Sequence, residues 1–465
     1  MTSVVAAAGR WMRAAVFGAA RRTRAAVLAG GLLVGGSLGG VASAQESAPG
    51  SVQVLHCGTA LLVPGEEPRR EVSIIVRGGK IAEIRDGFVS GSEARLPEGA
   101  SPIDLRDHFV MPGLFDCHTH LTSQQVPMGE RLRRTLTEEP THSAIDGTVY
   151  AERTLMAGFT TVRNVGSLGS DIYALRDRIA AGVIPGPRIL AAGRSIAVTG
   201  GHADRTNGIS PILRPEMTPM DGIADGPYEM RKAVRERVKR GSDLIKITAT
   251  GGVLSNTAAG VDQQMFEDEI RAVVETARTM GRKVAAHAHG SDGIKAAVRA
   301  GVDSIEHGTY LDDEAIELFK EHGTYLVPTI HAGKFVAEKA EEPGYFNDAI
   351  RVKAAAVGPQ IQASVARAYR AGVKIAFGTD VGVGAHGSNA LEFEYLVEAG
   401  VSEMDALKMA TVHAADLCGL SEQLGTLEVG KIADIIAVPG NPLERISVMR
   451  SVRFVMKEGK VYRRP

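Results

Sequence analysis

The sequence predicts an α/β fold, a (β/α)8 TIM barrel with a small β-sandwich domain formed by both chain ends. Two observations lead to this prediction. Eight short apolar runs alternate with helix-length segments through the middle of the chain, as parallel strands do when helices connect them. Near both ends, apolar and polar residues instead alternate around turn signals, which is typical of antiparallel strands.

The first 44 residues differ in composition from the rest of the chain. The apolar stretch 25–41 is followed by the small-x-small sequence Ala42-Ser43-Ala44, and it is preceded by Arg10, Arg13, Arg21, Arg22 and Arg24. These are the parts of a secretory signal peptide over residues 1–44, with cleavage near Gln45. The stretch is rich in glycine and compares poorly with the roughly 20 strongly apolar residues that a membrane anchor needs. We expect a periplasmic or secreted protein without membrane contact after cleavage, exported by either the Sec or the twin-arginine route.

The remaining chain divides into three predicted segments. Residues 45–112 hold the first part of the β-sandwich, and residues 424–465 hold the second part. The barrel occupies residues 113–423, with its first apolar run beginning slightly earlier. The eight runs are 109–116, 159–166, 188–195, 244–251, 283–290, 304–310, 325–332 and 374–380. Helical patterns that end in glycine, such as 229–241, 267–281 and 292–301, lie between them.

Composition narrows the range of functions. The formal net charge is -1, from 53 basic and 54 acidic residues, so no long-range field attracts nucleic acid or an anionic membrane. A small-molecule or dipeptide substrate is therefore the expected partner. The three cysteines are too few for a disulfide framework, so stability must come from the core.

Metal-capable side chains lie at the carboxyl ends of the predicted strands, where barrel active sites form. They are His118 and His120 after the first strand, Lys246 in the fourth, His287 and His289 in the fifth, His307 in the sixth and Asp380 in the eighth. A lone H-x-H pair fits core packing equally well. However, side chains two residues apart share one strand face, so His118 and His120 can bind one ion together. Imidazole nitrogen and carboxylate oxygen suit zinc or a similar divalent ion.

Lys246 requires a separate explanation because a buried cation beside a metal centre is unfavourable. Carbon dioxide can convert its amine into an anionic carbamate with two oxygens that bridge two metal ions. The alternative is an ordinary lysine whose amine reaches solvent at the barrel rim. The apolar neighbours Ile245 and Ile247 favour the carbamate.

Five motifs occur in order: GLFDCHTHL, IKITATGG, AAHAHG, SIEHG and FGTD. In these motifs the chain resembles the metal-dependent amidohydrolase superfamily, in its imidazolonepropionase-like and Xaa-Pro dipeptidase-like branch. Within that branch it is similar to the bacterial carboxypeptidase-type amidohydrolases that degrade ochratoxin A. The resemblance covers nearly everything after the signal peptide. It implies two divalent metal ions, expected to be Zn²⁺, and a homo-oligomer that can be as large as an octamer.

The resemblance also implies the role of each motif residue. His118, His120 and Asp380 hold one zinc, His287 and His307 hold the second, and carboxylated Lys246 bridges them with a hydroxide. The implied reaction is attack of this metal-bound hydroxide on an amide bond to a C-terminal amino acid, in a dipeptide or N-acyl amino acid. Hydrolysis of ochratoxin A to ochratoxin alpha and phenylalanine is one example. Asp380 accepts the proton of the attacking water and delivers it to the leaving amine.

Four further residues are candidates for substrate binding. His289 shares a strand face with His287 and can point into the same cavity. His202, Tyr228 and Ser123 lie in segments that follow predicted strands. For each of these three, an ordinary loop or surface side chain is an equal alternative.

Two other functions remain open at this stage. A mononuclear deaminase or cyclic-amide hydrolase on a similar barrel would use one ion and leave Lys246 without a role. A non-catalytic binding protein would need no metal, but such a protein has no physical reason to keep five metal-ligating side chains beside a buried lysine.

Overall fold

The computed structural model describes residues 52–97, 99–255 and 260–465. The predicted signal peptide, residues 1–44, lies outside the described residues. Within the described ranges, no helix is both long enough and apolar enough to cross a membrane. The described chain is an α/β protein with three β-sheets and twelve α-helices among these residues.

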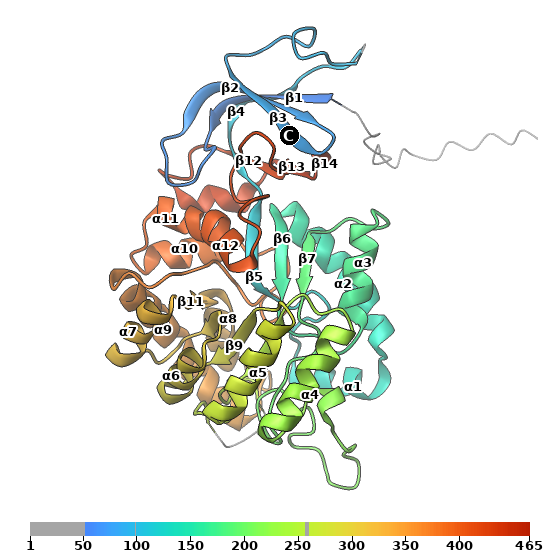
Figure 1. The fold of residues 1–465 in the computed structure, drawn as a ribbon, viewed down its shortest axis with the longest axis vertical. Coiled ribbons are helices and arrows are strands. Elements are labelled where there is room, and N and C mark those ends of the chain that lie inside the picture. The colour runs from blue at the N-terminus through green and yellow to red at the C-terminus, as the bar shows by residue number, and fades with distance from the viewer. Residues whose placement is uncertain (1–51, 98, 256–259) are drawn as a thin grey trace, which may run out of the picture. The chain divides into compact units, whose positions relative to one another are not determined.

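Both chain ends contribute to one seven-stranded sheet, in the order β14-β13-β12-β4-β1-β2-β3 (Figure 1). Its pairs are antiparallel except for β1 with β4, which run parallel. The strands are β1 (Val52–Ala60), β2 (Arg69–Arg77), β3 (Lys80–Asp86), β4 (Ile103–Pro112), β12 (Ile435–Pro439), β13 (Phe454–Lys457) and β14 (Lys460–Arg463). Their inward apolar side chains form one buried cluster. The ends therefore meet as expected, but all seven strands belong to a single hydrogen-bonded sheet, and the two-layered sandwich stays a prediction.

The middle of the chain forms two parallel sheets. The first has the order β5-β6-β7 and the second the order β11-β10-β9-β8. The strands are β5 (Leu114–Thr119), β6 (Phe159–Asn164), β7 (Arg188–Ala191), β8 (Ile245–Thr248), β9 (Val284–Ala288), β10 (Ser304–His307) and β11 (Tyr325–Val327). Six of these strands lie within predicted runs, and β5 overlaps the run 109–116 at residues 114–116, because residues 109–112 belong to β4.

The eighth predicted run, 374–380, is not a regular strand. It makes isolated parallel bridges on both sides, from Ile375 to Leu326 and from Val381 to Thr119. The regular ladder of backbone hydrogen bonds is interrupted here, because the Thr379 N–H donates to the Asp116 carboxylate instead of to a backbone carbonyl of a neighbouring strand. At the other junction, Ile196 bridges to Ile247 of β8. Backbone pairing therefore links the two parallel sheets at both of their edges.

Helices connect these strands, as the alternating pattern predicted. They are α1 (Met128–Thr137), α2 (Pro140–Met156), α3 (Asp171–Ala180), α4 (Gly226–Lys239), α5 (Glu267–Thr279), α6 (Ser291–Ala300), α7 (Asp313–His322), α8 (Ile330–Ala340), α9 (Asp348–Arg370), α10 (Leu391–Glu398), α11 (Glu403–Lys408) and α12 (Ala414–Cys418). Short helical turns are η1 (Pro219–Asp221), η2 (Met409–His413) and η3 (Ile446–Ser451). Gly301 and Gly323 end α6 and α7 in the left-handed conformation, which glycine adopts without a steric penalty. The largest apolar cluster lies between the parallel strands and these helices.

Candidate metal centre

The predicted metal-capable residues all lie where parallel strands end. They are His118 in β5, His120 just after β5, Lys246 in β8, His287 in β9, His307 at the end of β10 and Asp380 in the segment 374–381. His120 has a side chain that is 25% exposed, whereas the other five residues are buried. The sequence therefore identified residues that the fold brings to one edge of the sheets.

Two compact groups of possible metal donors occur among the described residues. One consists of His287, His289 and His307, and the other of His118, His307 and Asp380. Within each group the donor atoms lie within 4.8 Å of one another. Asp380 Oδ1 is 3.6 Å from His118 Nε2 and 3.1 Å from His120 Nε2. The two groups are contiguous, because they share His307.

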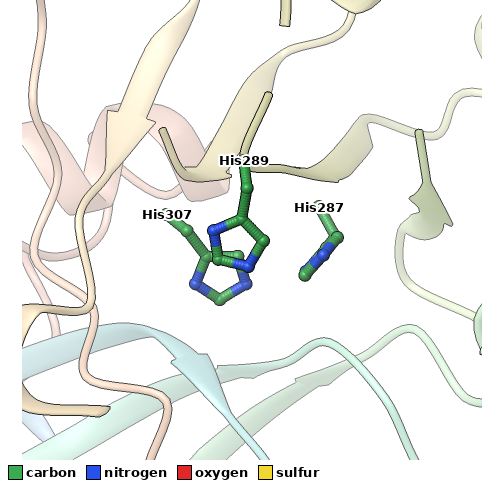
Figure 2. A group of neighbouring side chains, drawn as sticks. All are labelled: His287, His289 and His307. Carbon is green, nitrogen blue, oxygen red and sulfur yellow. The ribbon is translucent and has the colours of Figure 1, made fainter. Parts of the chain in front are cut away.

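This grouping differs from the expected ligand sets in two respects. His307 stands between both groups, and its ring centroid is 5.0 Å from that of His118. His289, expected to bind substrate, lies with the candidate ligands. Figure 2 shows its ring against that of His307, at a centroid distance of 4.8 Å, while His287 lies beside them. The expected division of ligands between two ions stays a prediction.

The clustered imidazoles are held in the neutral form that binds metals. Burial lowers the pKa of His118 and His202 to about 4, that of His289 to about 3, and those of His287 and His307 well below the ordinary value. The positive charge of Lys246 acts in the same direction on each ring. His120 is the exception: burial opposes the charged form, but the neighbouring Asp380 carboxylate raises its pKa. Neutral rings present a nitrogen lone pair to a metal ion.

Lys246 is a buried amine at the centre of this charge pattern. Its side chain is 4% exposed, and among the described residues its Nζ has no hydrogen-bond partner. Burial lowers its pKa to about 8, with a further lowering by Arg163, while Glu306 and Asp380 oppose that shift. An unpaired buried ammonium is unfavourable, and the lowered pKa makes the neutral amine, and with it a modified side chain, more accessible near neutral pH.

Glu306 and Arg163 form a buried support that the sequence analysis did not single out. Glu306 accepts from His118 Nδ1 at 2.8 Å and from Arg163 Nη2 at 2.7 Å. Burial would raise the pKa of Glu306, but the charges of Arg163 and Lys246 keep it well below its usual range. Because a carboxylate only accepts, His118 carries its proton on Nδ1 and turns a bare Nε2 toward Asp380. The available signal was an acidic residue within a predicted strand, directly before the candidate ligand His307.

Asp116 is a second residue that sequence reasoning missed. Its buried carboxylate accepts from the backbone N–H groups of His118 and Thr379, both at 3.1 Å. It also accepts from the Thr379 hydroxyl at 2.6 Å and from the Asn389 amide at 2.8 Å. One side chain thereby ties β5 to the segment that carries Asp380.

Three residues at successive strand ends have left-handed backbone conformations. They are His307 (φ 73°), Thr329 (φ 57°) and Asp380 (φ 59°). Such conformations cost roughly 1–3 kcal/mol each and cluster at functional sites. Thr329 Oγ1 lies 2.7 Å from His307 Nδ1, so two of these residues hold each other. In a regular strand, successive side chains point to opposite faces. The left-handed backbone changes the direction in which the His307 and Asp380 side chains point, so that they no longer follow this rule.

The four predicted substrate-binding residues differ in their distance from the histidine cluster and in their exposure. His289 is buried and bonded through Nδ1 to Thr309 Oγ1 at 2.6 Å. His202 stacks on His287 with a centroid distance of 4.2 Å. The side chain of Ser123 is exposed, and only its backbone carbonyl takes part in a contact here, as the acceptor of a hydrogen bond from His386 Nε2. The structure thus brings His289 and His202 into the cluster.

Tyr228 is not brought into the cluster. Its side chain is 86% exposed, with the Arg231 guanidinium 5.9 Å from its ring centre. The buried face of α4 includes Met230 and Val234, and a residue two positions before Met230 falls on the opposite side of the helix. The exposed side chain fits the alternative of an ordinary surface residue, and a role for Tyr228 in substrate binding stays a prediction.

The strand-end cluster, with neutral imidazoles beside a buried carboxylate, defines a candidate metal centre in an α/β protein. The amidohydrolase family model matches residues 109–462. The chain belongs to the amidohydrolase family, whose superfamily is metal-dependent, and it is a hydrolase that acts on C–N bonds, including amide bonds.

Three relatives agree with this assignment. A solved Xaa-Pro dipeptidase with methionine bound in its active site is 46% identical, with a TM-score of 0.85, covering 89% of this chain and 100% of that one. Ochratoxinase of Aspergillus niger is 33% identical over 450 residues, covering 91% of this chain and 89% of the relative. Imidazolonepropionase of Acidiphilium cryptum is 27% identical over 395 residues, covering 80% and 90%. The expected branch of the superfamily is confirmed.

Proposed function

We propose that this chain is an exported, binuclear zinc amidohydrolase that cleaves the amide bond to a C-terminal amino acid. Its substrates would be dipeptides or N-acyl amino acids, with ochratoxin A as one example. The observation that carries the proposal is the convergence of imidazoles, a carboxylate and an unpartnered buried lysine at the strand ends. The Xaa-Pro dipeptidase with methionine in its active site and the ochratoxinase support an amino acid as one product.

The residues present fit two divalent ions. His118, His120 and Asp380 would hold one, and His287 with His307 the other. The orphaned Nζ of Lys246 is the structural reason to place a carbamate between them, because a carbamate converts a repelling cation into an anionic ligand. When bound, the ions supply Lewis acidity toward a carbonyl oxygen and lower the pKa of water.

The protein's own groups would orient the site and move the proton. Glu306 fixes the His118 tautomer through Nδ1. Asp380 Oδ1 accepts the proton of the attacking water and passes it to the departing nitrogen, which leaves as a neutral amine. His289, oriented by Thr309, would donate a hydrogen bond to the substrate. His202 covers His287 and limits access to it from that side.

The proposal includes a closed (β/α)8 barrel with the two metal ions at its mouth. Support comes from the isolated bridges that join Ile196, in the segment after β7, to β8 and the segment 374–381 to both β11 and β5. Periplasmic or secreted location, and a homo-oligomer that can reach an octamer, are further parts of the proposal. Neither nucleic acid nor membrane is an expected partner of the mature chain.

The test is hydrolysis of a panel of N-acyl amino acids that includes N-acyl-phenylalanine, glycine and proline derivatives and ochratoxin A. Release of free amino acid should require divalent metal and should stop on chelation. The N-acyl amino acid amides, which lack the free carboxylate, are the matched control and should be poor substrates. If no member of the panel releases amino acid in a metal-dependent way, the proposed substrate class is wrong.

A mononuclear deaminase or cyclic-amide hydrolase is the second candidate, favoured by the likeness to imidazolonepropionase. It predicts one bound ion per chain and an unmodified Lys246. Metal quantification together with an intact-mass measurement of the carbamate under mild conditions separates the two candidates.

A further inference from the structure

A buried arginine outside the metal centre lacks a counter-charge. Arg237 of α4 is 2% exposed, and arginine stays protonated inside proteins. Among the described residues, no carboxylate forms an ion pair with it within 4.0 Å. Its Nη2 donates to the carbonyl oxygens of Met220, at 3.0 Å, and Pro219, at 3.4 Å. Its Nε is buried without a partner.

This guanidinium, which has no carboxylate partner among the described residues, belongs to a residue that lines a small cavity of about 50 Å³. The same cavity is lined by Arg194 and Arg240, and by Asp221 and Tyr173. A single water needs roughly 10–15 Å³ of such space, so the cavity accommodates a small ion and excludes a large organic one. The lining residues come from the segments that follow β6 and β7 and from the region of α3 and α4.

The other two arginines that line the cavity are already paired. Arg194 Nη1 is 3.5 Å from Asp221 Oδ1, and Arg240 Nε is 2.7 Å from Glu236 Oε1. The buried carboxylate of Asp171 also acts on Arg194 through its charge. Arg237 is the one of the three lining arginines without a carboxylate within 4.0 Å among the described residues, and it is the most buried of them.

We infer that this cavity is a binding site for a small inorganic anion, a halide or a tetrahedral oxyanion such as phosphate. The guanidinium of Arg237 supplies positive charge in the wall of the cavity, and Arg194 and Arg240 supply attractive charge from the sides. Burial of a guanidinium without a counter-ion is strongly unfavourable, and a bound anion removes that penalty. Guanidinium groups are well suited to such ligands because their donors match oxyanion geometry.

The first experiment measures thermal unfolding of the mature protein in sodium phosphate or sodium bromide, against sodium gluconate at equal ionic strength. Gluconate is too large for the cavity. We expect the Tm to rise saturably, by a few degrees, in at least one of the two small anions, because a ligand that binds only the folded state stabilises it. Arg237→Met should abolish the anion-specific rise. The matched control is Arg231→Met on the same helix, whose guanidinium lies 3.6 Å from Glu275, and it should retain the rise.

The second experiment requires no variant and covers the case in which Arg237→Met does not fold. Crystals of the unsubstituted protein soaked in bromide should show an anomalous peak in the cavity beside Arg237. Arg240→Gln, at the rim, should raise the half-saturating concentration several-fold. The inference is overturned if the cavity shows no bromide, or if both small anions act no differently from gluconate.

Discussion

Replacement of Glu306 by glutamine tests the buried support beneath the metal centre. The substitution keeps the size of the side chain but removes its charge, so Arg163 loses its only ion-pair partner among the described residues. Both side chains are almost fully buried, at 0% and 4% exposure. Breaking such a pair costs about 3–5 kcal/mol, because it leaves an uncompensated buried charge.

The assay is urea-induced unfolding of the metal-free protein, followed by a zinc titration of the folded variant. We expect the free energy of unfolding of Glu306→Gln to fall by the amount stated. Zinc affinity should fall about 10–100-fold, because the partner that orients His118 is weakened. Glu83→Gln, which removes a half-exposed carboxylate paired with Arg77 and Arg85, is the matched control and should change neither quantity appreciably.

A double variant separates lost charge balance from lost packing. In Glu306→Gln with Arg163→Met, no buried charge is left unpaired, so the loss of stability should be smaller than the sum of the two single losses. Coupling energies of about 0.5–3 kcal/mol are expected for residues in contact. A loss below about 1 kcal/mol for Glu306→Gln alone, or unchanged zinc affinity, would refute the reasoning.

Three other substitutions extend these tests. Lys246→Ala should abolish amide hydrolysis, and short carboxylic acids that replace the carbamate should restore part of it; no rescue together with two bound ions would contradict a bridging role. Asp380→Asn should lower kcat about 10²–10⁴-fold, the usual loss when a general acid–base group is removed, and an unchanged kcat would exclude it from proton transfer. Asp312 caps α7 by accepting from the Ala315 N–H; burial would raise its pKa, but hydrogen bonds from Ser291, Ala315 and Lys295 lower it to about 2. Its stabilisation is thus present above pH 4 and is lost as the pH falls toward 2. In urea unfolding, Asp312→Ala should therefore have a lower free energy of unfolding than the unsubstituted chain at pH 7, but not at pH 2. Asn347→Ala removes a cap of α9 that does not titrate, so its loss of stability should be the same at both pH values.

Elements with a strong local pattern could be predicted from the sequence, whereas elements that depend on distant partners could not. Seven parallel strands lie where apolar runs were recognised, because a buried strand needs little beyond continuous apolar residues. The run 374–380 loses its regular ladder through a hydrogen bond to Asp116, more than 250 residues away in sequence. The sandwich was expected from alternation alone, and alternation does not distinguish one curved sheet from two layers.

The metal-capable residues were found because strand ends meet in parallel folds, but their supports were not. The period of two places Glu306 and His307 on opposite strand faces, although both contact His118. The left-handed backbone of His307 (φ 73°) explains how both side chains reach His118. A single sequence does not predict this conformation for a residue other than glycine. The face of α4 that carries Tyr228 could not be predicted from the sequence, because it depends on where the helix begins.

The strained strand ends and the buried carboxylates are two parts of one arrangement. Left-handed conformations at His307 and Asp380 together cost a few kcal/mol, and this cost persists only if other contacts hold those residues in place. The Asp116 carboxylate accepts hydrogen bonds from the backbone N–H groups of both His118 and Thr379. The Thr329 hydroxyl forms a hydrogen bond with the His307 ring. The donor atoms are thus fixed before any ligand arrives, so an ion that binds does not have to order them. Preorganisation of this kind favours a cation once Lys246 has lost its positive charge, because every imidazole of the cluster except that of His120 has a lowered pKa and the Asp380 carboxylate lies beside them.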